Sequence, residues 1–402
     1  MTPAARIQAA IEILDRALRG EAAEAVLTGW ARSNRFAGSG DRAGIRDLVY
    51  DALRCQASYA HLGGASATQL ADTSMTGGGI TGRMLMLGLL RAQGVDPTTL
   101  FTGEKFAPDA LNSLEEIVPQ APTGLTALDC PAWLETSLRA NLGAEFEAVM
   151  GVLRTRAPLF LRVNIAKASV AEAMAALDAE GIVTQPTSLA KNALEVIENP
   201  RKVAGSLAYT QGLVEVQDAA SQAVIESLEI TAGMKVLDYC AGGGGKVLAM
   251  AAMAPKAKFV AHDIDAGRTG DIPVRAKRAG AKISMAAPYE AEAQGPYDLV
   301  VIDAPCSGSG TWRRTPEAKW RLTPERLKEL AGIQVEILAA VAPMVKSGGH
   351  VAYMTCSLLD VENFTQIESF LAANPDWTLC SERSMTPLEG GDGFYTAVLR
   401  KP

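Results

Sequence analysis

Two cysteines stand where the sequence could place a nucleophile. Cys306 follows the apolar run at 297–304, and Cys356 lies near the end of the apolar run at 350–357. Runs of this length and composition predict buried parallel strands, and ligands bind at the carboxyl ends of such strands. Both thiols are therefore expected at the rim of one cleft. A thiolate placed there could attack a substrate and form a covalent intermediate.

A glycine-rich loop and an acidic residue predict a bound nucleoside in the same cleft. The sequence DYCAGGGGK runs from Asp238 to Lys246, and its four glycines let the backbone approach a ligand closely. Asp263 ends the next strand-like run, about 20 residues further on, where a carboxylate can accept hydrogen bonds from ribose hydroxyls. A dinucleotide could use a similar loop, but hydride transfer has no need of two thiols. The pattern therefore favours S-adenosylmethionine.

Methyl transfer to C5 of a cytosine is a reaction that needs a thiol. C5 is a poor nucleophile until a thiolate adds to the neighbouring C6. Asp303 lies just before Cys306, so an acid and a thiol are expected together at the mouth of the cleft. The residues alone do not say which thiol attacks, and the simpler alternative for either one is a buried structural cysteine.

A basic and aromatic segment follows the first of these cysteines. Trp312, Arg313 and Arg314 begin it, and residues 313–328 hold six Lys or Arg against two Glu, although the whole chain has a net charge of −7. If exposed, these three residues would stack on unpaired bases and contact phosphates of RNA. In the alternative, the tryptophans pack under the sheet.

The sequence pattern predicts three domains. Apolar residues recur at helical spacing through residues 1–150, which indicates an all-α domain, and 151–214 reads as a small α/β linking module. From 215 to 402 strand-like and helical runs alternate, which predicts a Rossmann-like, doubly wound and mostly parallel sheet. The last run, 394–401, suits an antiparallel strand at the sheet edge.

Composition excludes several other classes of protein. No apolar run approaches the roughly 20 residues that a membrane span needs, and the N-terminal pattern is that of an amphipathic helix rather than a signal peptide. We therefore expect a cytoplasmic protein with no membrane partner. The six cysteines show no Cys-x-x-Cys spacing and the chain has three histidines, so neither a metal site nor a disulfide framework is expected.

These motifs together resemble a known family. DYCAGGGGK, HDID, DAPCSGSGTWRR, TCS and DGFYTAVLR are similar to the motifs of the Sun/Nop family of RNA cytosine-5 methyltransferases, over about residues 214–402. The helical start, with DRAGIRDLVYDALR at 41–54, resembles the NusB-like domain of the bacterial small-subunit rRNA members. The region 158–214 is similar to the family's linking module.

The resemblance implies a role for each candidate residue. Cys356 would be the nucleophile, Cys306 would assist release of the methylated product, and Asp303 would help to protonate the base while closing the cofactor site. The residues implied to hold S-adenosylmethionine are Cys240, Ala241, Gly242, Gly243, Gly244, Gly245, Lys246, Asp263 and Asp303. The implied substrate is a cytidine of small-subunit rRNA.

One departure from the family pattern keeps alternatives open. Its members usually have an aspartate near the adenine at the end of the third strand, whereas KISMAAPYE, from residue 282, has none. The same chemistry on tRNA is one alternative. A catalytically idle RNA-binding factor for ribosome assembly is another, although retention of both thiols and Asp303 argues against it.

Overall fold

The computed structural model describes residues 1–71 and 79–402, which form two compact units. The first unit contains Met1–Arg156 together with Trp312–Leu322. The second contains Ala157–Thr311 and Thr323–Pro402. A short segment from the last quarter of the sequence thus belongs to the N-terminal unit.

All regular secondary structure in the described residues of the first unit is helical. Its helices are α1 Pro3–Leu18, α2 Ala23–Ser33, α3 Ser39–Arg54, α4 Gln56–Leu62, α5 Ala67–Ala71, α6 Gly82–Ala92, α7 Gly124–Ala127, α8 Glu135–Leu142, α9 Phe146–Leu153 and α16 Pro316–Arg321. Leu14, Ile45 and Leu85 are fully buried where α1, α3 and α6 pack together. The prediction of an all-α N-terminal region is confirmed.

Local sequence explains where these helices begin and how closely they pack. The hydroxyl of Thr2 accepts a hydrogen bond from the Ala5 amide and so caps α1, in which Pro3 takes the first position. Gly88 lets α6 approach α4, because a Cβ there would lie 1.8 Å from the carbonyl oxygen of Tyr59. Any side chain at this position would push the two helices apart.

The inserted segment Trp312–Leu322 is bound firmly within the helical unit. The indole of Trp320 is 3% exposed and donates a hydrogen bond to the Leu53 carbonyl over 2.8 Å. Lys319, also buried, donates to the Arg54 carbonyl at 3.1 Å. These contacts satisfy carbonyls at the C-terminus of α3, which have no partner inside the helix itself.

A small sheet opens the second unit. Its elements, with the helix that follows them, are β1 Leu159–Val163, α10 Val170–Asp178, β2 Thr184–Pro186, β3 Ala193–Val196, α11 Leu207–Thr210, β4 Val214–Val216 and α12 Ala219–Glu226. The strands pair antiparallel in the order β2-β3-β1-β4. Arg162 of β1 is buried and donates to the Gly245 carbonyl at 2.7 Å, which fixes this module to the start of α13.

The large sheet has seven strands in the order β10-β11-β9-β8-β5-β6-β7. Its elements are β5 Lys235–Asp238, α13 Gly245–Met253, β6 Lys258–Ala261, α14 Ile272–Ala279, β7 Ile283–Met285, α15 Pro288–Ala293, β8 Tyr297–Asp303, α17 Pro324–Val341, β9 Val345–Thr355, α18 Phe364–Ala373, β10 Thr378–Met385 and β11 Phe394–Arg400. The strands β5 to β9 are parallel, which confirms the predicted doubly wound sheet.

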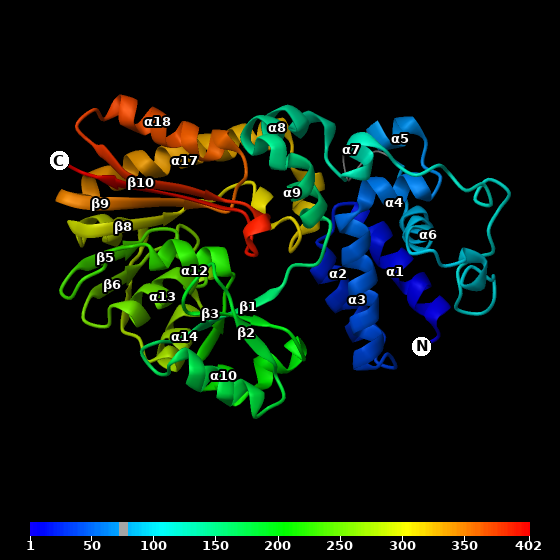
Figure 1. Ribbon diagram of the computed structural model, residues 1–402, viewed down its shortest axis with the longest axis horizontal. Helices are drawn as coiled ribbons and strands as arrows, with labels where there is room; N and C mark the ends of the chain where they lie inside the picture. The colour runs from blue at the N-terminus through cyan, green and yellow to red at the C-terminus, as the bar shows by residue number, and fades with distance from the viewer. Residues whose placement is uncertain (72–78) are drawn as a thin grey trace. The chain divides into compact units, whose positions relative to one another are not determined.

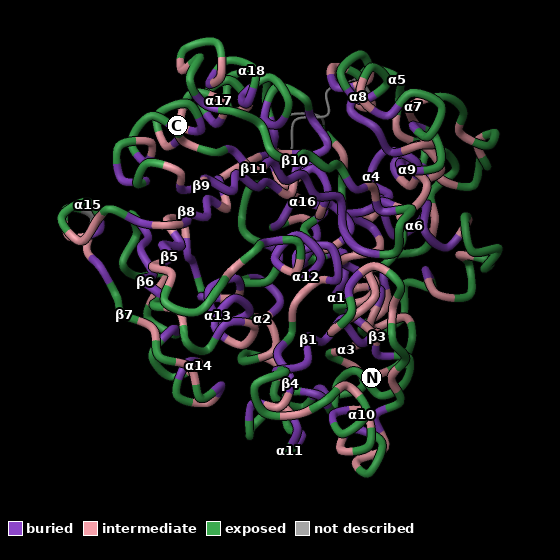
Figure 2. The backbone as a smooth tube through the Cα atoms, turned by 60° about the vertical axis from the view of Figure 1, so that its left-hand side comes forward, coloured by how far each residue is buried: buried purple, intermediate pink, exposed green. Residues whose placement is uncertain are grey.

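Helices cover both faces of this sheet, and the strands are apolar for that reason (Figure 1). Along β8, Leu299 and Val301 pack against the face covered by α12 and α13, whereas Val300 and Ile302 face α17 and α18. Figure 2 shows β8, β9 and β11 mostly in the colour of buried residues. Within the described residues no helix is long and apolar enough to cross a membrane.

The edge of the sheet differs from the prediction. The strand β11 does run antiparallel to β9, but it lies inside the sheet, because β10 pairs with its other side. The sequence of β10, TLCSERSM, has no apolar run, and almost all of its residues are exposed. An edge strand open to water needs no such run, so the hydrophobic pattern did not reveal it.

Candidate active site

The glycine loop turns sharply between β5 and α13. Gly242 and Gly244 have φ values of +49° and +81°, in the left-handed region that side chains disfavour. A Cβ on Gly244 would also lie 2.8 Å from Cγ1 of Ile272. The loop therefore needs glycine at this position both for its backbone conformation and for its close packing on α14.

The carboxylate of Asp263 anchors this loop. Its Oδ2 accepts a hydrogen bond from the Gly242 amide at 2.9 Å, and its Oδ1 accepts one from the Asp265 amide at 3.0 Å. The guanidinium of Arg268 lies 3.4 Å from Oδ2. Because the residue is only 5% exposed, the loop and Arg268 already use much of its hydrogen-bonding capacity.

A cavity of about 280 Å³ is lined by residues of this loop. Of the nine residues expected to hold the cofactor, all except Gly244 and Asp263 line it. The lining also includes six residues that were not expected from the sequence: Val216, Gln217, Ser221, Asp238, Arg268 and Arg275. Asp238 stood inside the DYCAGGGGK motif, and that position was a signal that could have identified it.

The fit of S-adenosylmethionine to this cavity can be judged from Asp238. Its carboxylate is 1% exposed, and neither oxygen has a hydrogen-bond partner among the described residues. A buried and unpaired carboxylate is unfavourable, and a cationic ligand would relieve that cost. S-adenosylmethionine carries positive charge on its sulfonium and amino groups, so the chemistry of the cavity suits it.

Binding of the cofactor should depend on pH through Asp238. Burial raises the pKa of this carboxyl to about 7, against the opposing effect of the Lys246 cation. Below that pH the acid is protonated and must lose its proton before it can pair with a cation. S-adenosylmethionine affinity should therefore rise as the pH increases towards 7, by at most about tenfold per pH unit, and then level off. Calorimetry across this range would measure it, and Asp238→Asn should bind with a flatter profile.

Asp263 should matter for affinity by holding the loop. Hydrogen bonds to charged groups contribute about 1.5–3 kcal/mol each, and Asp263→Ala removes the acceptor of the Gly242 amide. We expect the dissociation constant for S-adenosylmethionine to increase at least about tenfold in calorimetry. Asp271→Ala removes an exposed acid at the start of α14 and serves as the control. An unchanged constant for Asp263→Ala would contradict this role.

Lys246 and Asp303 form an ion pair at the border between the cavity and the cysteines. Lys246 Nζ lies 2.5 Å from Asp303 Oδ2, and both residues line the cavity. Burial lowers the pKa of Lys246, but the charge and hydrogen bond of Asp303, together with the charges of Asp238 and Cys356, outweigh that effect, so the pKa is raised. The lysine therefore stays charged and orients Asp303 at the end of β8.

The structure brings the two predicted thiols together. The Sγ atoms of Cys306 and Cys356 lie 3.5 Å apart, because β8 and β9 are neighbouring parallel strands. The hydrogen bond to Cys356, burial and the charge of Glu362 raise the pKa of Cys306 well above its ordinary value. Cys306 is therefore held as a neutral thiol, in contact with the second sulfur.

Glu362 connects the two cysteine loops and was not identified from the sequence. The residue is fully buried, and its carboxylate accepts hydrogen bonds from the Ser307 amide at 2.8 Å and from Ser357 Oγ at 2.5 Å. It also accepts from Ser307 Oγ, and from Gln334 Nε2 at 3.1 Å. Ser307 follows Cys306 and Ser357 follows Cys356, so one side chain fixes both loops.

The predicted exposed RNA contact is wrong for two of its three residues. Trp312 is 0% exposed and Arg313 is 3% exposed, so neither can present its side chain to a base or a phosphate. The Arg313 carbonyl accepts a hydrogen bond from Arg54 Nε at 2.7 Å, within the helical unit. Arg314 is partly exposed, and its contact with RNA stays a prediction.

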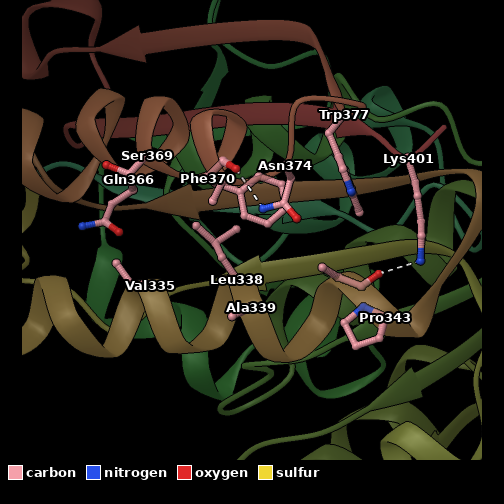
Figure 3. Close-up of a pocket in the computed structure, with 12 residues that line it drawn as sticks. Val335, Leu338, Ala339, Pro343, Gln366, Ser369, Phe370, Asn374, Trp377 and Lys401 are labelled. Carbon is pink, nitrogen blue, oxygen red and sulfur yellow. Dashed lines mark hydrogen bonds between the residues drawn. The ribbon is translucent and has the colours of Figure 1, made fainter.

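A larger cavity lies away from this chemistry. It measures about 450 Å³ and lies between α17 and α18 (Figure 3). Leu338, Phe370 and Trp377 give it an apolar lining, and the Lys401 amine is held at its rim by the carbonyls of Ala342 and Val345. Its lining includes no thiol and no carboxylate, so we place the active site at the smaller cavity.

Comparison with known proteins gives two family matches. Residues 225–400 match the family described as 16S rRNA methyltransferase RsmB/F. Residues 130–204 match the ferredoxin-like domain of RsmF/B-like methyltransferases. Among solved structures, the crystal structure of PH0851 has a TM-score of 0.77 at 23% identity and covers 100% of this chain and 99% of its own. NSun6 from Pyrococcus horikoshii with SFG has a TM-score of 0.60 at 18% identity, over 67% of this chain and 98% of its own.

Curated relatives identify the family. Ribosomal RNA small subunit methyltransferase B of Citrobacter koseri is 36% identical over 284 residues, which cover 67% of this chain and 66% of that protein. The protein of the same name from Shigella sonnei is 33% identical over 300 residues, 71% of this chain and 70% of its own. The matched regions thus span about two thirds of these relatives. The chain belongs to the RsmB/F family of 16S rRNA methyltransferases.

Proposed function

We propose that this protein transfers a methyl group from S-adenosylmethionine to C5 of a cytidine in small-subunit rRNA. The observation that carries the proposal is the pair of thiols 3.5 Å apart, next to the ion pair of Lys246 and Asp303. Two adjacent thiols have no use in methylation of an oxygen or an exocyclic nitrogen. The names of the curated relatives support small-subunit rRNA as the substrate.

In this proposal Cys356 is the nucleophile. Its thiolate adds to C6 of the cytosine ring, which makes C5 nucleophilic, while Asp303 helps to deliver a proton to the ring. When bound, S-adenosylmethionine supplies an electrophilic methyl group. Lys246, Asp238 and the loop from Cys240 to Gly245 would hold the cofactor.

Release needs the covalent bond between sulfur and C6 to break. A base removes the C5 proton, the electrons of that bond re-form the C5–C6 double bond, and Cys356 leaves as a thiolate. The raised pKa of Cys306 keeps this thiol protonated, and its Sγ lies 3.5 Å from the departing sulfur. Cys306 would therefore assist release by donating a hydrogen bond to the leaving thiolate.

The test is a methylation assay with separate RNA pools. The protein is incubated with labelled S-adenosylmethionine and with unmethylated small-subunit rRNA or tRNA. Digestion to nucleosides should reveal label in 5-methylcytidine from the rRNA pool. Label in another nucleoside would overturn the C5 assignment, label in tRNA alone would overturn the substrate, and label in neither pool would overturn the enzymatic role.

A further inference from the structure

A corner of the helical unit exposes an aromatic ring among arginines. The corner is formed by the end of α2, the loop at 34–38 and the start of α3, and in Figure 1 α3 begins near the N-terminus. Phe36 in this loop is 74% exposed. Arg32, Arg35 and Arg42 are exposed on the same short stretch of chain.

The charge of this corner is strongly positive. Arg32, Arg35 and Arg42 form no ion pair with any residue that the structure describes. The acid within the corner, Asp41, is neutralised by the Met1 amino group at 3.1 Å and by Arg6 at 3.6 Å. The first amides of α3 add the positive end of a helix dipole over a helix of 16 residues. In a chain with a net charge of −7, this local positive charge favours the approach of an anionic partner.

The combination of groups favours RNA over an acidic protein. Guanidinium groups bind phosphates with paired hydrogen bonds, and an exposed aromatic ring offers a face on which an unpaired base can stack. An acidic peptide would use the charges but not the ring. We propose that this corner, residues Arg32, Arg35, Phe36 and Arg42, binds single-stranded RNA. The inference rests on the proposed function, in which RNA is the substrate.

Two variants of the 402-residue chain test the arginines and the aromatic ring of this surface separately. Binding of labelled mixed-sequence single-stranded RNA is measured by anisotropy at several salt concentrations. Changing Arg32, Arg35 and Arg42 to alanine together should weaken binding and flatten the log-log salt dependence by roughly 2, since each phosphate contact contributes about 0.7. Phe36→Ala should weaken binding about 5- to 150-fold at every salt concentration and leave the slope unchanged.

Matched controls come from the same unit. Arg19→Ala removes an exposed arginine, and Phe106→Ala removes a ring that is 69% exposed, both outside the corner. Each should bind RNA like the wild type. Calorimetry with S-adenosylmethionine should give the wild-type constant for all four variants, which shows that the cofactor site is intact.

The possible results distinguish this inference from the proposed function. If the wild type methylates rRNA but the corner variants keep its RNA affinity and slope, the corner is not the RNA contact and only this inference fails. If the wild type neither binds nor methylates RNA, the proposed function fails as well. If polyglutamate binds more tightly than RNA, with the same sensitivity to the variants, the partner is an acidic protein and the RNA assignment is overturned.

Discussion

Cys356→Ala should abolish methyl transfer and leave no covalent complex with RNA. Without the thiol nothing adds to C6, so C5 stays unreactive, and a covalent catalyst that loses its nucleophile commonly loses about 10⁴-fold or more in rate. Methyl transfer is followed with labelled S-adenosylmethionine, and the adduct by denaturing gel electrophoresis with labelled RNA. Cys380→Ala, which removes an exposed thiol on β10, should behave like the wild type.

Cys306→Ala should give the opposite result in denaturing gel electrophoresis, a covalent complex with RNA that accumulates. Attack by Cys356 and methyl transfer still occur, but the departing thiolate loses the hydrogen bond from its neighbour 3.5 Å away. The enzyme should stall after transfer and accumulate an RNA complex that survives denaturation. Accumulation of the adduct with Cys356→Ala instead would reverse the two roles.

The sequence predicts the parallel part of the sheet well, because each of these strands is buried on both faces. The runs that end at Asp238, Asp263 and Asp303 correspond to β5, β6 and β8, and the run that holds Cys356 corresponds to β9. The polar edge strand β10 left no such signal. The predicted domain boundaries at 150 and 214 stay a prediction, and the membership of Trp312–Leu322 in the helical unit was not foreseen.

Only those residues of the site that lie in local sequence motifs could be predicted. The two thiols and the glycine loop come directly after strands of the parallel sheet. Because the carboxyl ends of parallel strands lie at one edge of the sheet, the sequence implies that the thiols and the loop lie close together. The local sequence does not distinguish tryptophans that contact RNA from tryptophans that pack in a core, and this holds for Trp312 and Trp320. The hydrogen-bond partner of Trp320, the Leu53 carbonyl, is 267 residues away in the sequence. In the sequence Glu362 looks like an ordinary acid before a helix. Its role becomes visible only in the structure, where both cysteine loops donate hydrogen bonds to it.

Glu362→Gln should reduce turnover about 10²-fold while leaving cofactor affinity unchanged. The amide keeps the shape of the side chain, but it puts a donor in place of one acceptor oxygen. That oxygen is either Oε1, which accepts from the Ser307 amide and from Gln334, or Oε2, which accepts from the hydroxyls of Ser307 and Ser357, so two of these hydrogen bonds are lost. The loops that carry the thiols would shift relative to each other, and a displacement of about 1 Å at a reacting group can cost this much in rate. Steady-state kinetics should show the loss in kcat, and Glu368→Gln, an exposed change on the following helix α18, should show none.

A second measurement distinguishes this positioning role from general loss of structure. The negative charge of Glu362 is one cause of the raised pKa of Cys306, so its neutralisation should lower that pKa. In a Cys356→Ser background, the pH dependence of Cys306 alkylation reports its pKa when it is followed on the peptide that contains Cys306, so that Cys240 and the exposed Cys380 do not contribute. Glu362→Gln should shift the alkylation profile to lower pH. Because loss of burial would lower this pKa as well, the shift is assigned to the charge of Glu362 only if the variant unfolds at the same temperature as its parent. A profile that does not move would mean that the charge of Glu362 does not act on the thiol, and Glu362 would then be a purely structural anchor.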